Sequence, residues 1–171
     1  MKTKRVIVVP YDENWKTDFL RIREEIRQAI GPWILAVEHV GSTSVEGLSA
    51  KPCIDLDVVI PDYSVFDHVV RGLEAIGYEH EGDLGISHRE AFRYTDKPHL
   101  RKHHLYVCPQ SSRELHRHVT FRDYLRSNPD AVRKYSAVKE EAARLFPEDI
   151  DGYMAHKAPC IQQMYKACGL E

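Results

Sequence analysis

The chain has 171 residues, enough to bury most of the apolar surface of one domain of ordinary size. Its 24 basic and 26 acidic residues give a net charge of −2, so no large positive field is available to hold nucleic acid by its phosphates. The four cysteines lack CxxC spacing, which argues against a zinc knuckle or a disulfide framework. No stable nucleic-acid complex is predicted, and reduced cysteines are favoured.

Two features of the sequence bear on location. In the opening stretch, MKTKRVIVVP, the basic residues are followed only by Val6 to Val9 before Pro10, whereas a signal peptide needs about 7 to 15 apolar residues. No later apolar run approaches the roughly 20 residues that span a bilayer. The sequence therefore predicts a cytoplasmic protein without a membrane partner.

Hydrophobic periodicity defines the elements of the first half of the chain. Apolar residues three or four positions apart predict a helix over residues 12–30, which Asp12 can cap and Gly31 ends. A short strand is expected over 33–40. Alternation of apolar and polar residues predicts a strand over 53–60. One face of that strand carries Ile54, Leu56, Val58 and Ile60, and the other carries Cys53, Asp55, Asp57 and Val59.

The remaining elements are expected in the following order. A helix begins at Ser64, with Asp67 in a capping-box position, and ends before Gly77. Short strands are expected over 78–81, 91–94 and 103–108, and three helices over 112–127, 129–147 and 149–168. We therefore expect an α/β fold with a mixed sheet and flanking helices. Residues 1–171 form a single domain in this prediction, with a sheet-containing core over 1–110 and helices over 111–171 packed on it.

The paired carboxylates Asp55 and Asp57 are the first candidates for chemistry. Two residues apart on a strand, they leave the same face about 6.5 to 7 Å apart at the backbone. That spacing suits one Mg²⁺ or Mn²⁺, or a pair of ions, and hard oxygen ligands favour these metals over zinc. The alternative is the solvated face of a half-exposed strand. A fully apolar opposite face and the mutual repulsion of the two charges favour the metal site.

A turn rich in hydroxyl groups precedes this strand. Gly41 permits close backbone approach, and the hydroxyls of Ser42, Thr43 and Ser44 can bind an anion together with exposed N–H groups. Such a turn is weak evidence alone, because Gly and Ser dominate ordinary turns. Followed by the two aspartates on a buried strand, it indicates a phosphate site beside a metal site.

The stretch "HVGSTSVEGLSAKPCIDLDV" resembles the signature of the GrpB family of uncharacterised proteins, part of the nucleotidyltransferase superfamily that includes DNA polymerase beta. The resemblance extends to "FRDYLRSNPDAVRKYSAVK", residues 121–139, and to "AHKAPCI", residues 155–161. It implies a minimal nucleotidyltransferase fold with a helical C-terminal half. It also implies that Gly41 and Ser42 contact a triphosphate and that Asp55 and Asp57 hold the metal.

The superfamily's catalytic members usually add a third carboxylate on a later strand. The corresponding strand here reads "HHLYVC" and contains no acid, so His104 and Tyr106 are expected to face the groove instead. His104 is then a candidate base or ligand. This departure leaves open whether the protein is an enzyme.

Several basic residues are candidates for neutralising a triphosphate, because guanidinium and ammonium groups bind phosphate oxygens. Each is otherwise an ordinary surface charge. Lys157 is a better candidate than most, since it interrupts the small, apolar segment "AHKAP". A zinc site among the histidines is disfavoured, because His116 and His118 point to different faces of a helix. The basic candidates are Lys51, Arg89, Arg93 and Lys102, while Lys139 and Lys157 of the helical half could close over the groove.

Two functions remain as predictions. The first is a metal-dependent nucleotidyltransferase that transfers a nucleoside monophosphate from a nucleoside triphosphate to an unknown acceptor. The second is a non-catalytic module on the same fold that binds a nucleotide or a coenzyme A precursor. The Gly-Ser turn followed by the two aspartates favours the nucleotidyltransferase. The missing third carboxylate favours the non-catalytic module.

Overall fold

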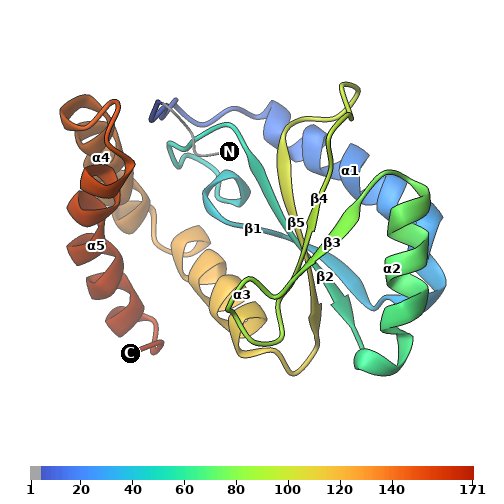
Figure 1. Ribbon diagram of the computed structural model, residues 1–171. Helices are drawn as coiled ribbons and strands as arrows, with labels where there is room; N and C mark the ends of the chain where they lie inside the picture. Colours follow the sequence, from blue (N-terminus) through green and yellow to red (C-terminus); the bar gives the residue numbers. More distant parts are fainter. Residues whose placement is uncertain (1–4) are drawn as a thin grey trace.

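The computed structural model describes residues 5–171, so residues 1–4 of the predicted N-terminal pattern lie outside the described part of the chain (Figure 1). Five strands form one sheet in the order β1-β2-β5-β4-β3. β2 and β5 run parallel, and the other neighbouring pairs run antiparallel. The expected mixed sheet is confirmed. The strands are β1 (Ala36–Val40), β2 (Ile54–Ile60), β3 (Glu79–Gly82), β4 (Glu90–Arg93) and β5 (His103–Pro109).

Five α-helices flank the sheet and confirm the helical C-terminal half. In Figure 1, α1 and α2 lie along one face of the sheet, while α4 and α5 form an antiparallel pair beside it. α3 packs on the opposite face, where Leu115 meets Val59 and Cys108. The division of the chain near residue 110 stays a prediction. The helices are α1 (Asn14–Ile30), α2 (Phe66–Ala75), α3 (Arg113–Arg126), α4 (Pro129–Leu145) and α5 (Ile150–Ala167).

Local capping shifts two helix starts from their predicted positions. The Asp12 carboxylate accepts a hydrogen bond from Asn14 N at 2.9 Å, so the first helix begins two residues later than expected. The predicted capping role of Ser64 is wrong. Asp62 caps a short 3-10 turn by accepting from Ser64 N at 2.8 Å, and α2 begins at Phe66.

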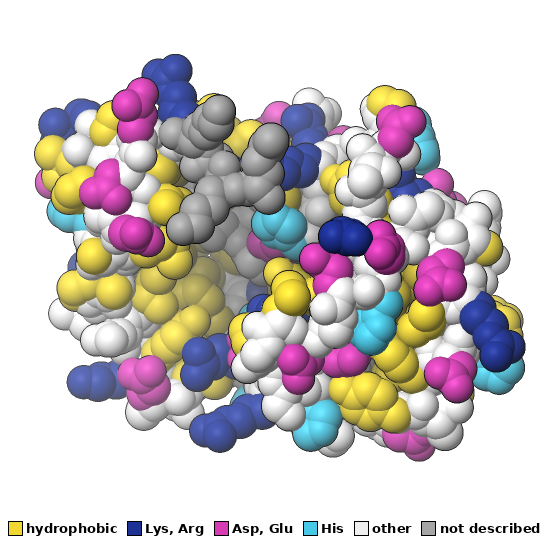
Figure 2. Space-filling view, in the orientation of Figure 1, with side chains coloured by type: hydrophobic (Ala, Val, Ile, Leu, Met, Phe, Trp, Pro, Cys, Tyr) yellow, Lys and Arg dark blue, Asp and Glu magenta, His cyan; other side chains and the backbone are white. Residues whose placement is uncertain are grey.

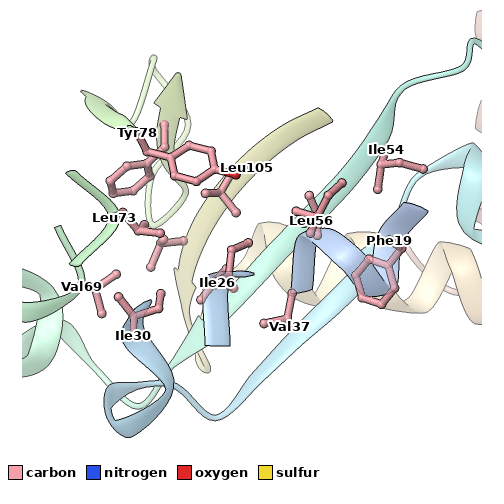
Figure 3. Packing of buried hydrophobic residues seen from close by; sticks show 14 of the residues in the cluster. Phe19, Ile26, Ile30, Val37, Ile54, Leu56, Val69, Leu73, Tyr78 and Leu105 are labelled. Carbon is pink, nitrogen blue, oxygen red and sulfur yellow. The ribbon is translucent and has the colours of Figure 1, made fainter. Parts of the chain in front are cut away.

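The core lies between the sheet and the α1–α2 layer (Figure 3). Ile54, Leu56 and Val58 of β2 are fully buried against this layer, as the alternation predicted. Burial of such a side chain contributes roughly 1.5 to 3 kcal/mol relative to its exposure. This face of the sheet is therefore closed, and only the opposite face can carry a site.

A second cluster of buried residues ties the turn after β1 to the C-terminal helices. Val45 and Leu48 pack against residues of α3, α4 and α5 such as Leu125 and Met164. Arg126 of α3 donates from Nε and Nη2 to the Ser44 carbonyl oxygen at 3.0 and 2.8 Å. The segment between β1 and β2 is thus fixed between the sheet and the helices. None of the helices in residues 5–171 is long and apolar enough to cross a membrane.

The close crossing of α1 and α2 at Gly72 gives a testable prediction. A Cβ at Gly72 would meet the Ile30 side chain and lie 3.0 Å from the Ala29 carbonyl oxygen. Gly72→Ala should therefore lower the free energy of unfolding by about 1 to 3 kcal/mol, although alanine favours helices. Gly31→Ala is the control, because its added methyl group would have no atom within 4 Å beyond the adjacent residues of the chain. Urea denaturation measures both, and equal stability of Gly72→Ala and wild type would contradict the packing.

Candidate functional site

The register of β2 and β5 aligns the candidate residues on the open face of the sheet. Asp55 is paired with His104, and Asp57 is paired with Tyr106. The side chains of both pairs therefore leave the face opposite Leu56. The sequence pattern predicted this arrangement, and the strand register confirms it.

Asp57 is fully buried and belongs to a chain of ionisable groups. One carboxylate oxygen, Oδ2, lies 2.6 Å from Nδ1 of His118, and Nε2 of His118 lies 3.1 Å from the Glu114 carboxylate. Burial raises the pKa of Asp57, while the hydrogen bond with His118 opposes the rise. The other oxygen, Oδ1, is buried and has no partner in the described part of the chain.

His118 is the functional candidate that sequence reasoning missed. Its spacing from His116 correctly indicated different helix faces, but no local pattern shows that α3 lies across the open face of the sheet. The only sequence signal was a carboxylate one turn away, since Glu114 and His118 are four residues apart on a helix.

Asp55 is half buried and pairs with His104. Its Oδ1 lies 2.9 Å from His104 Nδ1. The hydrogen bonds with Asp55 and Cys53 raise the pKa of His104 to about 10, so the imidazole is a cation at neutral pH in the free protein. The predicted role of His104 as a base is therefore less favoured than a role as a charge partner or ligand.

The turn before β2 needs glycine at its first position. Gly41 has a φ of 72° and a ψ of −175°, a combination that other residues rarely adopt. A Cβ there would lie 3.1 Å from Asp55 Cβ and would also run into Asp55 Oδ2. Gly41 therefore lets the turn lie directly against the Asp55 carboxylate.

The three hydroxyls of this turn have different partners. Thr43 Oγ1 lies 2.9 Å from Nε2 of the buried His39, and the Ser44 hydroxyl donates to the Gly41 carbonyl oxygen. Ser42 Oγ instead accepts a hydrogen bond from Lys139 Nζ of α4. Ser42 thus links the turn to the C-terminal helices.

A pocket of about 390 Å³ lies between this turn, the starts of β2 and β5, and helices α4 and α5. Figure 2 shows the surface hollowed between the α4–α5 side and the sheet side of the molecule. The pocket brings together six residues predicted from the sequence as site residues, and it also contains Lys139, which the sequence indicated as a residue that could close over the groove. These six are Ser42, Thr43, Lys51, Asp55, His104 and Lys157.

Two lysines of the pocket are buried. Burial lowers the pKa of Lys139 to about 7 and that of Lys157 to about 8. Lys139 Nζ also donates to the Ser49 carbonyl oxygen at 3.2 Å, and it lies 4.5 Å from the centre of the Tyr135 ring. The pocket therefore offers amine donors that gain charge when an anion approaches them.

Other predicted substrate residues lie outside this pocket. The Arg89 guanidinium lies 4.4 Å from the centre of the Tyr106 ring, a cation–π contact on the same face of the sheet as Asp57. Arg93 is exposed and pairs with Glu79 at 2.9 Å. Ser44 borders a different pocket beside Arg126. Substrate contact by these four residues, Arg89, Arg93, Tyr106 and Ser44, stays a prediction.

The carboxylates of Asp55 and Asp57 are the candidate ligands for a divalent cation on the open face of the sheet. Asp55 Oδ2 points toward Gly41, and the buried Asp57 Oδ1 has no hydrogen-bond partner in residues 5–171. An unsatisfied carboxylate oxygen in a buried setting is the group that a hard cation would neutralise. Coordination of Mg²⁺ or Mn²⁺ by Asp55 and Asp57 remains a prediction that this geometry accommodates.

The fold defines the class of protein. The Cid1 poly(U) polymerase in its MgGTP-bound form superimposes with a TM-score of 0.55 at 13% identity, over 79% of this chain and 44% of that chain. At this identity the likeness shows the fold alone. Together with the mixed sheet and its helices, it identifies a nucleotidyltransferase-like fold.

Within that class the chain belongs to the GrpB family, whose model, described as GrpB protein, matches residues 5–167. The conserved protein GrpB from Enterococcus faecalis has a TM-score of 0.82 at 36% identity, over 95% of this chain and 96% of that chain. The glutamate-rich protein GrpB of Alkalihalophilus pseudofirmus is 31% identical, with 93% of each chain covered. The resemblance seen in the sequence motifs is confirmed.

Other relatives are longer than this chain. The chain spans 46% of the UPF0157 protein YqkA of Bacillus subtilis, to which it is 31% identical over 159 residues. It also spans 45% of a dephospho-CoA kinase of Mycolicibacterium paratuberculosis, at 30% identity over 186 residues. A GrpB-like region therefore occurs as part of longer proteins.

The buried amine of Lys139 gives a prediction about pH. Its folded-state pKa lies below the ordinary value of 10.5, so the unfolded chain binds more protons between about pH 7 and 10.5. Wild-type stability should rise with pH across that window, and the penalty for the buried charge should be fully present below it. Lys139→Met removes the titrating group. The free energy of unfolding of Lys139→Met minus that of wild type should be highest near pH 6. This difference should fall by on the order of 2 to 4 kcal/mol toward pH 10.

Urea unfolding at several pH values measures this difference. Lys134→Met is the matched control, because Lys134 lies on the exposed side of the same helix. A stability difference between Lys139→Met and wild type that does not change with pH would show that the amine titrates normally.

Proposed function

We propose that this protein is a metal-dependent nucleotidyltransferase that transfers a nucleoside monophosphate from a nucleoside triphosphate to an acceptor hydroxyl. The observation that carries the proposal is the pocket in which Ser42 of the turn, the Asp55 carboxylate and the buried lysines of α4 and α5 meet. A carboxylate for a cation and amines for an anion in one pocket suit a metal–triphosphate complex. The nucleotidyltransferase-like fold supports the same reaction class.

The roles of the residues follow from their places. Lys139 and Lys157 bind phosphate oxygens and are protonated more fully as they do so. Ser42 donates its hydroxyl, and Gly41 lets the turn approach the phosphates without a side chain in the way. Asp55 and Asp57 hold Mg²⁺ or Mn²⁺, which, when bound, offsets the negative charge of the reacting phosphates.

The proposed transfer is an in-line displacement at the α-phosphorus of the nucleotide. The acceptor oxygen forms a bond to the α-phosphorus, and the bond between that phosphorus and the bridging oxygen of pyrophosphate breaks. The acceptor proton leaves to solvent or to a basic group of the substrate, because His104 already carries a proton in the free protein. Lys157, on the α5 side of the pocket, stabilises the charge of the departing pyrophosphate.

Nucleotide binding tests the proposal through Asp55. In thermal unfolding with each nucleoside triphosphate, Mg²⁺ should allow at least one of them to raise the unfolding temperature of wild type by several degrees. Asp55→Asn should lose that shift, since it loses the charge facing the cation. Asp67→Asn, an exposed carboxylate of α2, is the control.

A turnover assay then distinguishes an enzyme from a protein that only binds the nucleotide. Release of pyrophosphate by wild type, at least tenfold slower in Asp55→Asn and in Lys157→Ala, would support the transferase. A metal-dependent shift that persists unchanged in Asp55→Asn would contradict the proposed site.

A second candidate function is a non-catalytic module that binds a nucleotide or a coenzyme A precursor. The site face of β5 carries His104 and Tyr106 where a third metal carboxylate is expected from the superfamily pattern. The match to a dephospho-CoA kinase supports this ligand class. For this function we expect dephospho-coenzyme A or a nucleotide to raise the unfolding temperature while no pyrophosphate is released. Loss of that shift in Lys139→Met, but not in Lys134→Met, would place the ligand in the pocket.

A further inference from the structure

Three different metal-binding side chains meet at the pocket end of the sheet. Cys53 directly precedes β2, Asp55 is two residues further on, and His104 faces Asp55 from β5. Cys53 Sγ lies 3.7 and 3.9 Å from the two ring nitrogens of His104, and His104 Nδ1 lies 2.9 Å from Asp55 Oδ1. One ligand atom of each residue lies within 4.8 Å of the other two.

These separations are close to the distances between ligand atoms in a tetrahedral metal site. With metal bonds of about 2.3 Å to sulfur and 2.0 to 2.2 Å to nitrogen and oxygen, ligand atoms in a tetrahedron lie about 3.4 to 3.6 Å apart. The sulfur–nitrogen distances in the free protein exceed this value slightly, and the nitrogen–oxygen distance is slightly shorter because a hydrogen bond holds that pair. Small side-chain rotations would bring all three ligands to one ion.

We propose that Cys53, Asp55 and His104 form a binding site for a transition-metal ion of the Zn²⁺ or Co²⁺ type. A thiolate and an imidazole select such ions over Mg²⁺, which prefers oxygen ligands. Asp55 and His104 also border the pocket, so the fourth position of the ion opens toward it. Three protein ligands and one open position are the pattern of catalytic rather than structural zinc sites.

The proposed site uses a different oxygen of Asp55 from the one available to the Mg²⁺ site that we propose for Asp55 and Asp57. Asp55 Oδ1 faces His104, whereas Oδ2 faces Gly41, so the two carboxylate oxygens point toward different neighbours. Cys53 is largely buried at 6% exposure, which shields its thiol. When the ion binds, the thiol proton and the imidazolium proton of His104 pass to solvent, and the oxidation state of every atom is unchanged.

Cobalt titration of the full chain tests this site without any nucleotide. In the reduced wild-type protein, Co²⁺ should produce the near-ultraviolet absorption of a thiolate–cobalt bond, at one ion per chain. Cys53→Ser should lose this band, and His104→Ala should weaken Co²⁺ binding by at least tenfold. The matched controls are Cys168→Ser near the end of α5 and His116→Ala on the exposed side of α3, and both should bind Co²⁺ as wild type does.

The outcomes separate this proposal from the nucleotidyltransferase proposal. Circular dichroism first shows which variants fold, and His104→Ala serves as the second probe if Cys53→Ser does not, because His104 is an exposed residue. Absence of a thiolate–cobalt band in wild type, or a band that survives in Cys53→Ser and disappears in Cys168→Ser, would overturn the site. Neither result affects Mg²⁺-dependent nucleotide binding, which is measured with no transition metal present.

Discussion

The parallel register of β2 and β5 is the constraint on which the rest of the site depends. It places Asp55 beside His104 and Asp57 beside Tyr106, and it also fixes the opposite face of both strands in the core. A slip of one residue would bury both carboxylates among the isoleucines of α1 and expose Leu56. Because that slip would cost the burial of several aliphatic side chains, the packing of the closed face holds the polar residues of the open face in position.

This register places the carboxylates of Asp55 and Asp57 in half-buried and fully buried positions, and a histidine lies against each of them. His104 reaches Asp55 from the neighbouring strand, whereas His118 reaches Asp57 from α3. The second contact has a wider effect, since it ties α3 to the sheet at a buried ion pair. Without that partner, Asp57 would be a buried carboxylate with an uncompensated charge, which costs several kcal/mol. The same contact therefore helps to position the helices that complete the pocket.

Sequence reasoning predicted the sheet strand by strand, because alternation and helical periodicity are local signals. It also named Asp55, His104, Ser42 and Lys157 as site residues, since the Gly-Ser turn and the alternation of the strands are local signals and Lys157 interrupts a small, apolar segment. His118 and the Asp62 cap were not predicted. His118 depends on how α3 crosses the sheet, a tertiary arrangement with no local signature, and the competition between Asp62 and Ser64 for the cap is decided by backbone geometry. The phosphate role of Arg93, whose side chain forms an exposed ion pair with Glu79, stays a prediction.

Burial of Lys139 and Lys157 limits the positive charge that these two amines hold in the pocket of the free protein. Lys139 is held by Ser42 and the Ser49 carbonyl, and its pKa near 7 means that roughly half of its population is neutral at that pH. Burying a permanently charged amine would cost several kcal/mol without a partner, whereas a neutral amine still donates hydrogen bonds. In the proposed function, a phosphate group entering the pocket supplies a counter-charge and favours uptake of a proton by Lys139. The partly neutral Lys139 therefore reduces the energetic penalty of a buried cation in the free protein, and the anion that we propose as ligand would favour the charged amine.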